Sequence, residues 1–196
     1  MIPIELQNLL NDNGETVTNR QAAEVGISRE RLRLLANTGC LERVATGVYI
    51  LPNALPDKMY MAQLRKPKII FSHETALFLH DLTDRDPLDY SVTVPQGYNT
   101  SALVSGSFNV FAVKQEFYEL GIVQMKTIFG HYVRTYCLER AICDCIRNRN
   151  RMDIAIVTDA IKRYVKRKDK NLHLLMEYAK SFRIAKSLRS YMEVLL

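Results

Sequence analysis

Three patterns in the sequence predict an α+β protein of two domains. Near the start of the chain, apolar residues recur at helical spacing. Between residues 88 and 136 they form short segments typical of strands, and from residue 138 they return to helical spacing. With 196 residues, 47% of them apolar, the chain can bury real cores. We expect an N-terminal domain at 1–54 and a mixed α/β domain at 55–196 that ends in a helical bundle.

Two short helices open the chain. Apolar residues within 3–12 fall on one helical side, and Gly14 ends this first helix. Thr18 precedes a helix whose third residue is Gln21, which is the spacing of a capping box. Gly26 supplies the left-handed conformation that ends the second helix after about two turns.

A serine-capped helix and a hairpin follow. Ser28 is a good N-cap for a helix over 29–38, which Gly39 ends. A short helix, a glycine-containing turn and a second capped helix are the helix-turn-helix arrangement. Two short segments joined through a glycine make a hairpin at 41–51, in the position of a wing. Residues 1–54 are therefore expected to form a winged helix-turn-helix domain.

The helix at 29–38 concentrates arginine near its start. Arg29, Arg31 and Arg33 lie beside the apolar side that contains Leu32 and Leu35. Arginine in the first turn opposes the helix macrodipole, so three of them suggest a compensating contact with phosphate or guanine. The alternative is a solvated face of good helix formers. The order of capped helix, turn, basic helix and hairpin favours double-stranded DNA.

The expected DNA contacts come from this helix and from the hairpin. A recognition helix places its N-terminal residues nearest the bases, so Arg29 and Arg33 are assigned to base edges or adjacent phosphates. Arg31 is assigned to phosphate, and the hairpin to the backbone or minor groove. The candidate DNA-binding residues are Arg20, Ser28, Arg29, Arg31, Arg33, Asn37, Arg43 and Thr46.

The remaining chain has the pattern of a mixed α/β domain. Pro52 and Pro56 mark a connector into a helix near 57–66. Strands are expected within about 88–136, and apolar residues at three-and-four spacing predict helices within about 138–196. Three or four packed helices should close the protein.

The net charge of +6 is unevenly distributed. Residues 131–196 hold 15 Lys and Arg against 7 Asp and Glu, whereas residues 1–60 and 61–130 each hold 6 against 7. Cations at a helix C-terminus are favourable by themselves, but their number here also suits a polyanion. The candidate C-terminal basic surface comprises Arg147, Arg149, Arg151, Lys162, Arg163, Lys166, Arg167, Lys168 and Lys170.

No pattern in the sequence predicts an active site. His73, His80 and the aspartates of 81–89 lie close together, but turn chemistry explains the aspartates and no H-x-x-x-H pair occurs. There is no phosphate-binding G-x-x-x-x-G-K loop, no nucleophile elbow and no Glu-x-Lys or Asp-x-Lys triplet on a candidate strand. We expect no catalytic residue, no metal ligand and no cofactor.

Composition also bears on location. The chain has no apolar run of the roughly 18 residues that a membrane span needs, and its start lacks the pattern of a signal peptide. Cys40, Cys137, Cys143 and Cys145 contain no C-x-x-C pair and are expected to be reduced thiols. We expect a cytoplasmic protein without a membrane partner.

Three segments together resemble a known family. The order "AAEVGISRERLRLLANTGCLERVATGVYIL", "FSHETALFLHDLTDRDPLDYSVTVPQGYN" and "RTYCLERAICDCI" is similar to the AbiEi antitoxins of bacterial AbiE abortive-infection systems. The likeness extends over nearly the whole chain, with the helix-turn-helix and "GVYIL" as its most specific part. The last sixty residues match mainly in type.

The resemblance implies an antitoxin that also represses its own operon. The winged-helix domain would bind inverted repeats in the promoter, with the recognition helix at 28–38 and the wing at 41–51. A nucleotidyltransferase-like toxin would be the functional partner, in a type IV system without a stable complex. Two copies on a repeat could be a preformed dimer or monomers that meet on DNA, and our working expectation is a monomer in solution.

Two other functions stay open at this point. The C-terminal domain could be an enzyme acting on nucleotide, RNA or the toxin, an idea motivated by its size and the His/Asp cluster. Alternatively, the protein could be a winged-helix transcriptional regulator with a ligand-sensing C-terminal domain and no toxin.

Overall fold

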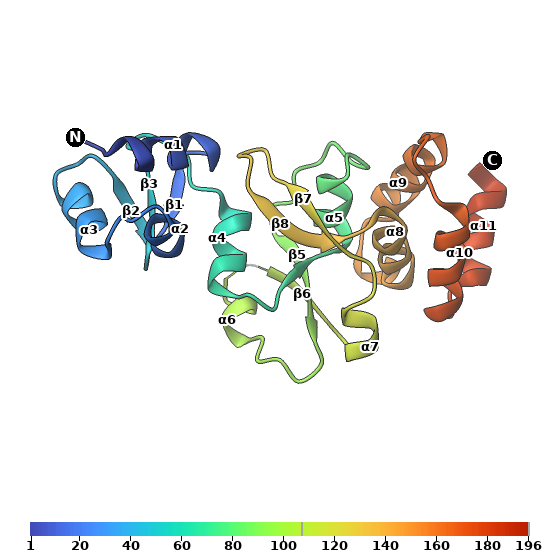
Figure 1. The fold of residues 1–196 in the computed structure, drawn as a ribbon. Helices are drawn as coiled ribbons and strands as arrows, with labels where there is room; N and C mark the ends of the chain where they lie inside the picture. The colour runs from blue at the N-terminus through green and yellow to red at the C-terminus, as the bar shows by residue number, and fades with distance from the viewer. Residues whose placement is uncertain (107, 196) are drawn as a thin grey trace. The chain divides into compact units, whose positions relative to one another are not determined.

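The computed structural model describes residues 1–106 and 108–195, and these form two compact units. The first unit comprises residues 1–65 and 126–132, and the second comprises 66–125 and 133–196. The protein is a mixture of helices and sheets, as Figure 1 shows.

The first unit packs helices against a small sheet. Its elements are α1 (Ile4–Asp12), β1 (Thr16–Thr18), α2 (Asn19–Glu24), α3 (Arg29–Asn37), β2 (Glu42–Ala45), β3 (Val48–Ile50) and α4 (Lys58–Arg65). The strand order is β1-β3-β2, and both pairings are antiparallel. One apolar cluster joins α1, α2, α3 and the sheet: Leu6, Leu10, Val17, Ala22, Leu32, Leu35, Leu41 and Tyr49.

The helix caps form as the sequence predicts. The Thr18 hydroxyl accepts from the backbone N–H of Gln21, and the Gln21 side chain accepts from the Thr18 backbone N–H, so the capping box is complete. The Ser28 hydroxyl accepts from the Arg31 N–H at 3.2 Å and starts α3. Between the helices Gly26 has φ +78°, a conformation that glycine adopts without steric cost. Strand β1 was not among the expected elements.

Helix α4 lies in the first unit, beyond the boundary expected near residue 54. Asp57 precedes it with only 2% of its surface exposed, and one carboxylate oxygen accepts from the Tyr60 N–H at 3.0 Å. The other accepts from the Thr127 hydroxyl at 2.5 Å and lies 2.8 Å from Nδ1 of His131. Asp57 thus links the start of α4 to segment 126–132, and both belong to the first unit, whereas the sequence placed residues 55–65 in the C-terminal domain.

The second unit contains a five-stranded mixed sheet. Its strands are β4 (Ile70–Phe71), β5 (Tyr90–Pro95), β6 (Phe108–Val113), β7 (Ile122–Lys126) and β8 (Tyr132–Tyr136), in the order β6-β5-β4-β8-β7. β5 pairs in parallel with β6, β4 pairs in parallel with β8, and β4 and β5 are antiparallel. The expected strands near 88–136 are present, but β4 lies before that range. It is too short to show a sequence period.

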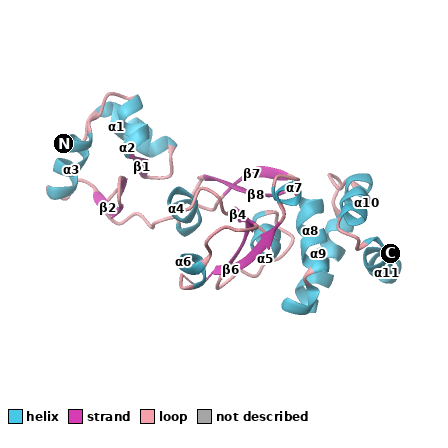
Figure 2. Ribbon diagram, turned by 90° about the horizontal axis from the view of Figure 1, so that it is seen from below, coloured by secondary structure: helices cyan, strands magenta, loops and turns pink. Residues whose placement is uncertain are grey.

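Helices make up the rest of the second unit. They are α5 (His73–Leu79), α6 (Ser101–Val104), α7 (Gln115–Tyr118), α8 (Leu138–Arg147), α9 (Ile154–Lys166), α10 (Leu172–Ser181) and α11 (Ala185–Leu195), with a short 3-10 helix η1 (Arg149–Arg151). α8 contacts α5, α9, α10 and α11. In Figures 1 and 2, α10 and α11 lie beyond α8 and α9 as seen from the sheet. The expected closing bundle is therefore confirmed.

Candidate nucleic-acid interface

The outer side of α3 presents three unpaired arginines. Leu32 and Leu35 are buried at 0% and 3% exposure, which fixes the inward side of the helix. Arg29, Arg31 and Arg33 are exposed, and within the described part of the chain none lies within 4 Å of a carboxylate oxygen. The guanidinium groups are therefore free to bind an anion.

Glu30 lies among these arginines without neutralising them through an ion pair. Hydrogen bonds from its own backbone N–H and from Ser28 lower the pKa of its carboxyl, and the charges of Arg29 and Arg33 act in the same direction. The carboxylate therefore lies at the start of its own helix, where the positive end of the helix macrodipole stabilises a negative charge.

The hairpin tip is held close to α2. The Asn19 N–H donates to the Gly47 carbonyl at 2.8 Å. A Cβ on Gly47 would approach Nδ2 of Asn19 to 2.7 Å, and φ of +72° also favours glycine there. The tip residue Thr46 is exposed beside this contact. The hairpin is therefore fixed relative to the helix pair instead of extending freely.

Other expected DNA-binding residues differ in availability. Arg20 is exposed but lies 3.3 Å from Glu24 in an i,i+4 pair, which is weak in water. The Ser28 hydroxyl is engaged as the cap of α3. The Nε of Arg43 donates to the Ala45 carbonyl at 3.3 Å, which bends its side chain along the hairpin. Asn37 is exposed in the last turn of α3.

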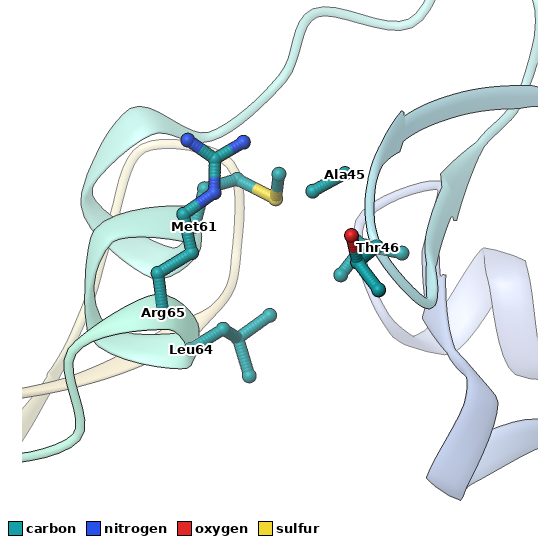
Figure 3. A pocket seen from close by; sticks show the side chains of 6 residues that line it. Ala45, Thr46, Met61, Leu64 and Arg65 are labelled. Carbon is teal, nitrogen blue, oxygen red and sulfur yellow. The ribbon is translucent and has the colours of Figure 1, made fainter.

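A groove separates the hairpin from α4 within the first unit. Its volume is about 490 Å³, and Figure 3 shows Thr46 on one wall opposite Leu64 and Arg65 on the other. Ala45, Val48 and Met61 complete the lining. Arg65 adds a cation near the wing position that the sequence interpretation did not include, because the expected boundary assigned it to the other domain.

Two arginines of the candidate C-terminal basic surface are engaged in ion pairs. Arg163 makes a bidentate pair with Asp84 at 2.5 and 2.9 Å and a second pair with Asp159 at 2.9 Å. Arg167 pairs with Asp169 at 2.8 Å and donates to the His80 carbonyl. Opposing carboxylates reduce their attraction for phosphate, so this part of the basic run is less available than expected.

The other members of that surface fall into two groups. The guanidinium of Arg151 stacks 4.4 Å from the Phe111 ring centroid, and Arg147 lies near Phe117 and Phe182. Arg149 and Lys170 donate to backbone carbonyls. Among the described residues all three of these arginines are exposed without an ion pair, and so are Lys162, Lys166 and Lys168, for which no ring contact is found either.

The His/Asp cluster has structural partners. His73 is buried, stacks on Phe111 at 3.5 Å between ring centroids, and contacts Ser72 and Asn148 through its two ring nitrogens. His80 contacts the Tyr136 carbonyl, and Asp84 is held by its ion pair with Arg163. In residues 1–106 and 108–195 no group of three His, Cys, Asp or Glu side chains is arranged to hold a metal ion.

The geometry of the first unit defines a helix-turn-helix protein with a basic outer helix. Residues 5–52, which contain α1 to α3 and the hairpin, match the family model AbiEi_4, described as "Transcriptional regulator, AbiEi antitoxin". Over these residues the match confirms the resemblance drawn from the sequence; it supports a role as an antitoxin and transcriptional regulator, and a regulator family of this kind implies DNA binding.

Two further comparisons concern the whole chain. The crystal structure of the RV2827C protein from Mycobacterium tuberculosis is similar with a TM-score of 0.51 and 12% sequence identity, covering 90% of this chain and 72% of that one. At this identity the likeness concerns the fold alone. A comparison with curated proteins gave no match. No helix in the described ranges has the length and apolarity to cross a membrane.

Proposed function

We propose that this protein is the antitoxin of a type IV abortive-infection system and that it represses its own operon. In this proposal the first unit is a winged helix-turn-helix domain that binds inverted repeats in the promoter. The observation that carries the proposal is the exposed arginine face of α3, which has no ion pair with any described residue and lies within the segment that matches the AbiEi family model.

The proposed docking follows the geometry of the unit. α3 enters the major groove, while the hairpin tip, held at α2 by the Asn19 contact with Gly47, approaches the backbone or minor groove. Two copies on a repeat occupy half-sites about one helical turn apart, roughly 34–36 Å or a multiple. The protein is proposed to be a monomer in solution that meets its second copy on DNA.

The second unit is assigned the antitoxic function. It counters a nucleotidyltransferase-like toxin in the cytoplasm without a stable complex and without enzymatic activity of its own. Phage defence is then the role of the pair. The support for this part is the family match at the N-terminus together with the sequence likeness that continues into the second unit.

The first test separates repression from protection. Replacing Arg29 and Arg33 by alanine should reduce promoter binding by about thirtyfold or more, because it removes two contacts with bases or phosphates that are worth roughly 1–3 kcal/mol each. Protection against the toxin should persist when the variant is expressed from a foreign promoter. Gel-shift titration at fixed salt and a growth assay measure the two functions.

Arg189→Ala is the matched control, since it removes an exposed arginine of α11 outside both candidate surfaces. It should bind the promoter like the unmodified protein. Promoter binding by the double variant at undiminished affinity would show that α3 is not the recognition helix. Loss of protection in the double variant would show that the first unit also acts on the toxin.

A ligand-sensing regulator without a toxin is the second candidate. The observation that favours it is a cavity of about 320 Å³ in the second unit, with Thr83, Asp84 and Arg85 on one side and α9 on the other. The gene next to this one discriminates between the candidates. A nucleotidyltransferase-like reading frame beside it supports the antitoxin, and its absence supports the regulator.

A further inference from the structure

We propose that α3 reads an A·T base pair in the major groove through Leu34 and Asn37. This inference rests on the proposed function and names the base pair that the helix selects. Leu34 supplies the apolar contact to the thymine methyl group, and Asn37 supplies the amide that recognises adenine. The arginines flank these two side chains and bind the surrounding phosphates or guanines.

The first observation is the exposure of Leu34. It is 50% exposed, whereas the other leucines of α3, Leu32 and Leu35, are buried in the apolar cluster of the unit. A single exposed leucine is common on protein surfaces and by itself indicates nothing. Its position on this helix is what distinguishes it, because it shares the exposed side with Arg31 and Arg33, with Glu30 one turn before it.

The helical geometry places Leu34 beside Asn37 on the outward side. An α-helix turns about 100° per residue, so residues three apart are neighbours on the surface. Leu34 and Asn37 lie opposite the side that buries Leu32 and Leu35. Arg29 and Arg31 lie nearer the two edges of this outward side. On a helix in the major groove, the edges face the phosphate walls and the centre faces the bases.

The chemistry of the two side chains suits one base pair. In the major groove adenine offers an N7 acceptor and an N6 donor, which an asparagine amide meets with two hydrogen bonds. Thymine offers a methyl group, and contact with an aliphatic side chain removes that methyl from water. A protein partner could also cover Leu34, but the exposed side of α3 carries three arginines against one carboxylate, Glu30, and within the described residues no ion pair neutralises these arginines, which favours a polyanion.

The test uses base analogues within the bound promoter site. After footprinting locates the site, each thymine is replaced in turn by uracil, which lacks the methyl group. The unmodified protein should lose about fourfold in affinity at one thymine of each half-site, the value of one buried methyl group. Leu34→Ala should bind more weakly and show no such loss at that position.

Asn37 is tested in the same way. Replacing the partner adenine by 7-deazaadenine removes the N7 acceptor. This replacement should lower the DNA affinity of the unmodified protein and leave the DNA affinity of the Asn37→Ala variant unchanged. Arg189→Ala should retain both sensitivities. Both residues are exposed, so the variants should fold, and circular dichroism with thermal unfolding checks this.

Two outcomes would overturn the inference while leaving the proposed function intact. One is specific promoter binding that is indifferent to every uracil and 7-deazaadenine replacement. The other is a dimer in sedimentation experiments that Leu34→Ala converts to a monomer, since Leu34 would then contact a second copy of the chain. Absence of any specific promoter binding by the unmodified protein would instead contradict the proposed function itself.

Discussion

His73 combines an unusual backbone conformation with complete enclosure. Its φ of +50° lies in the left-handed region, which costs free energy for a side chain that is not glycine. Burial, followed by the charges of Arg140 and Arg151, holds its pKa well below the ordinary 6.5. Ser72 and Asn148 meet its ring nitrogens at 2.9 and 3.0 Å. These contacts offset the backbone strain when the imidazole is neutral, and they disfavour its protonation.

The buried neutral imidazole should make the second unit sensitive to acid. The unfolded chain binds a proton near pH 6.5 and the folded chain does not, so stability is complete above that pH and falls as the pH drops towards the folded pKa. We expect the free energy of unfolding to fall by up to about 1.4 kcal/mol per pH unit from this group. Urea titrations between pH 7.5 and about pH 5 measure the slope.

His73→Asn is the diagnostic variant because asparagine tolerates a positive φ. It should lower stability at neutral pH and flatten the acid slope. His173→Asn changes an exposed histidine of α10 and should leave the slope as it was. An unchanged slope in His73→Asn would assign the acid sensitivity to other groups, of which His80, with its pKa also lowered by burial, is the first to examine.

At the scale of elements, local signals were predictable and distant contacts were not. The caps at Thr18 and Ser28 act within three residues, so the start of α2 and α3 could be identified from the sequence. Asp57 and His131 are 74 residues apart, and nothing near either residue indicates the partner. For the same reason the sequence could not show that α4 and segment 126–132 belong to the first unit.

The candidate site shows the same division. The outward arginines and the exposed Asn37 follow from helical period alone, and the structure has them exposed on α3. The ion pairing of Arg163 does not follow from the helical period, since its main partner, Asp84, is 79 residues away in the sequence. Leu34 was overlooked because an apolar residue in a helix is usually assigned to the core. Its exposure of 50% in the structure, together with the helical period, separates it from Leu32 and Leu35.

The turn after α1 should be intolerant of any side chain. Gly14 has φ +53°, and a Cβ there would collide with the carbonyl oxygen of Phe129. Gly14→Ala must therefore displace segment 126–132 in addition to straining the turn. We expect a loss of more than about 2 kcal/mol in the stability of the first unit, since positive-φ strain alone costs about 1–2 kcal/mol.

Gly39→Ala is the control for the strain alone. Gly39 has φ +72°, and a Cβ added there would have no other atom within 4 Å. Hydrogen exchange of the α1 and α2 amides reports the stability of the first unit in both variants. Equal losses in the two variants would mean that the Phe129 carbonyl moves aside at no cost.

At the scale of the whole molecule, the net charge overstates the number of cationic side chains that are free to bind a polyanion. The basic excess lies in residues 131–196, yet Arg140 is fully buried and pairs with Asp144 at 2.9 Å. Arg163 and Arg167 are also paired, so much of the formal charge is balanced within the second unit. Among the described residues, the exposed cations there without an ion pair include three lysines at the end of α9, Lys162, Lys166 and Lys168.

If these lysines contact DNA, they do so through phosphates and not through bases. Replacing all three by alanine should weaken binding to the promoter and to a scrambled duplex by the same factor. The slope of log affinity against log salt should shrink by up to about three, because each phosphate contact contributes roughly 0.9. The position of the footprint should not change, since α3 still selects the site.

The matched control removes the same charge from α10 and α11 through Lys180→Ala, Lys186→Ala and Arg189→Ala, all of them exposed. Titrations from about 50 to 200 mM salt on both duplexes compare the two triple variants. A slope that shrinks equally in both would indicate a general effect of net charge. A slope that shrinks in neither would show that Lys162, Lys166 and Lys168 make no contact with phosphate.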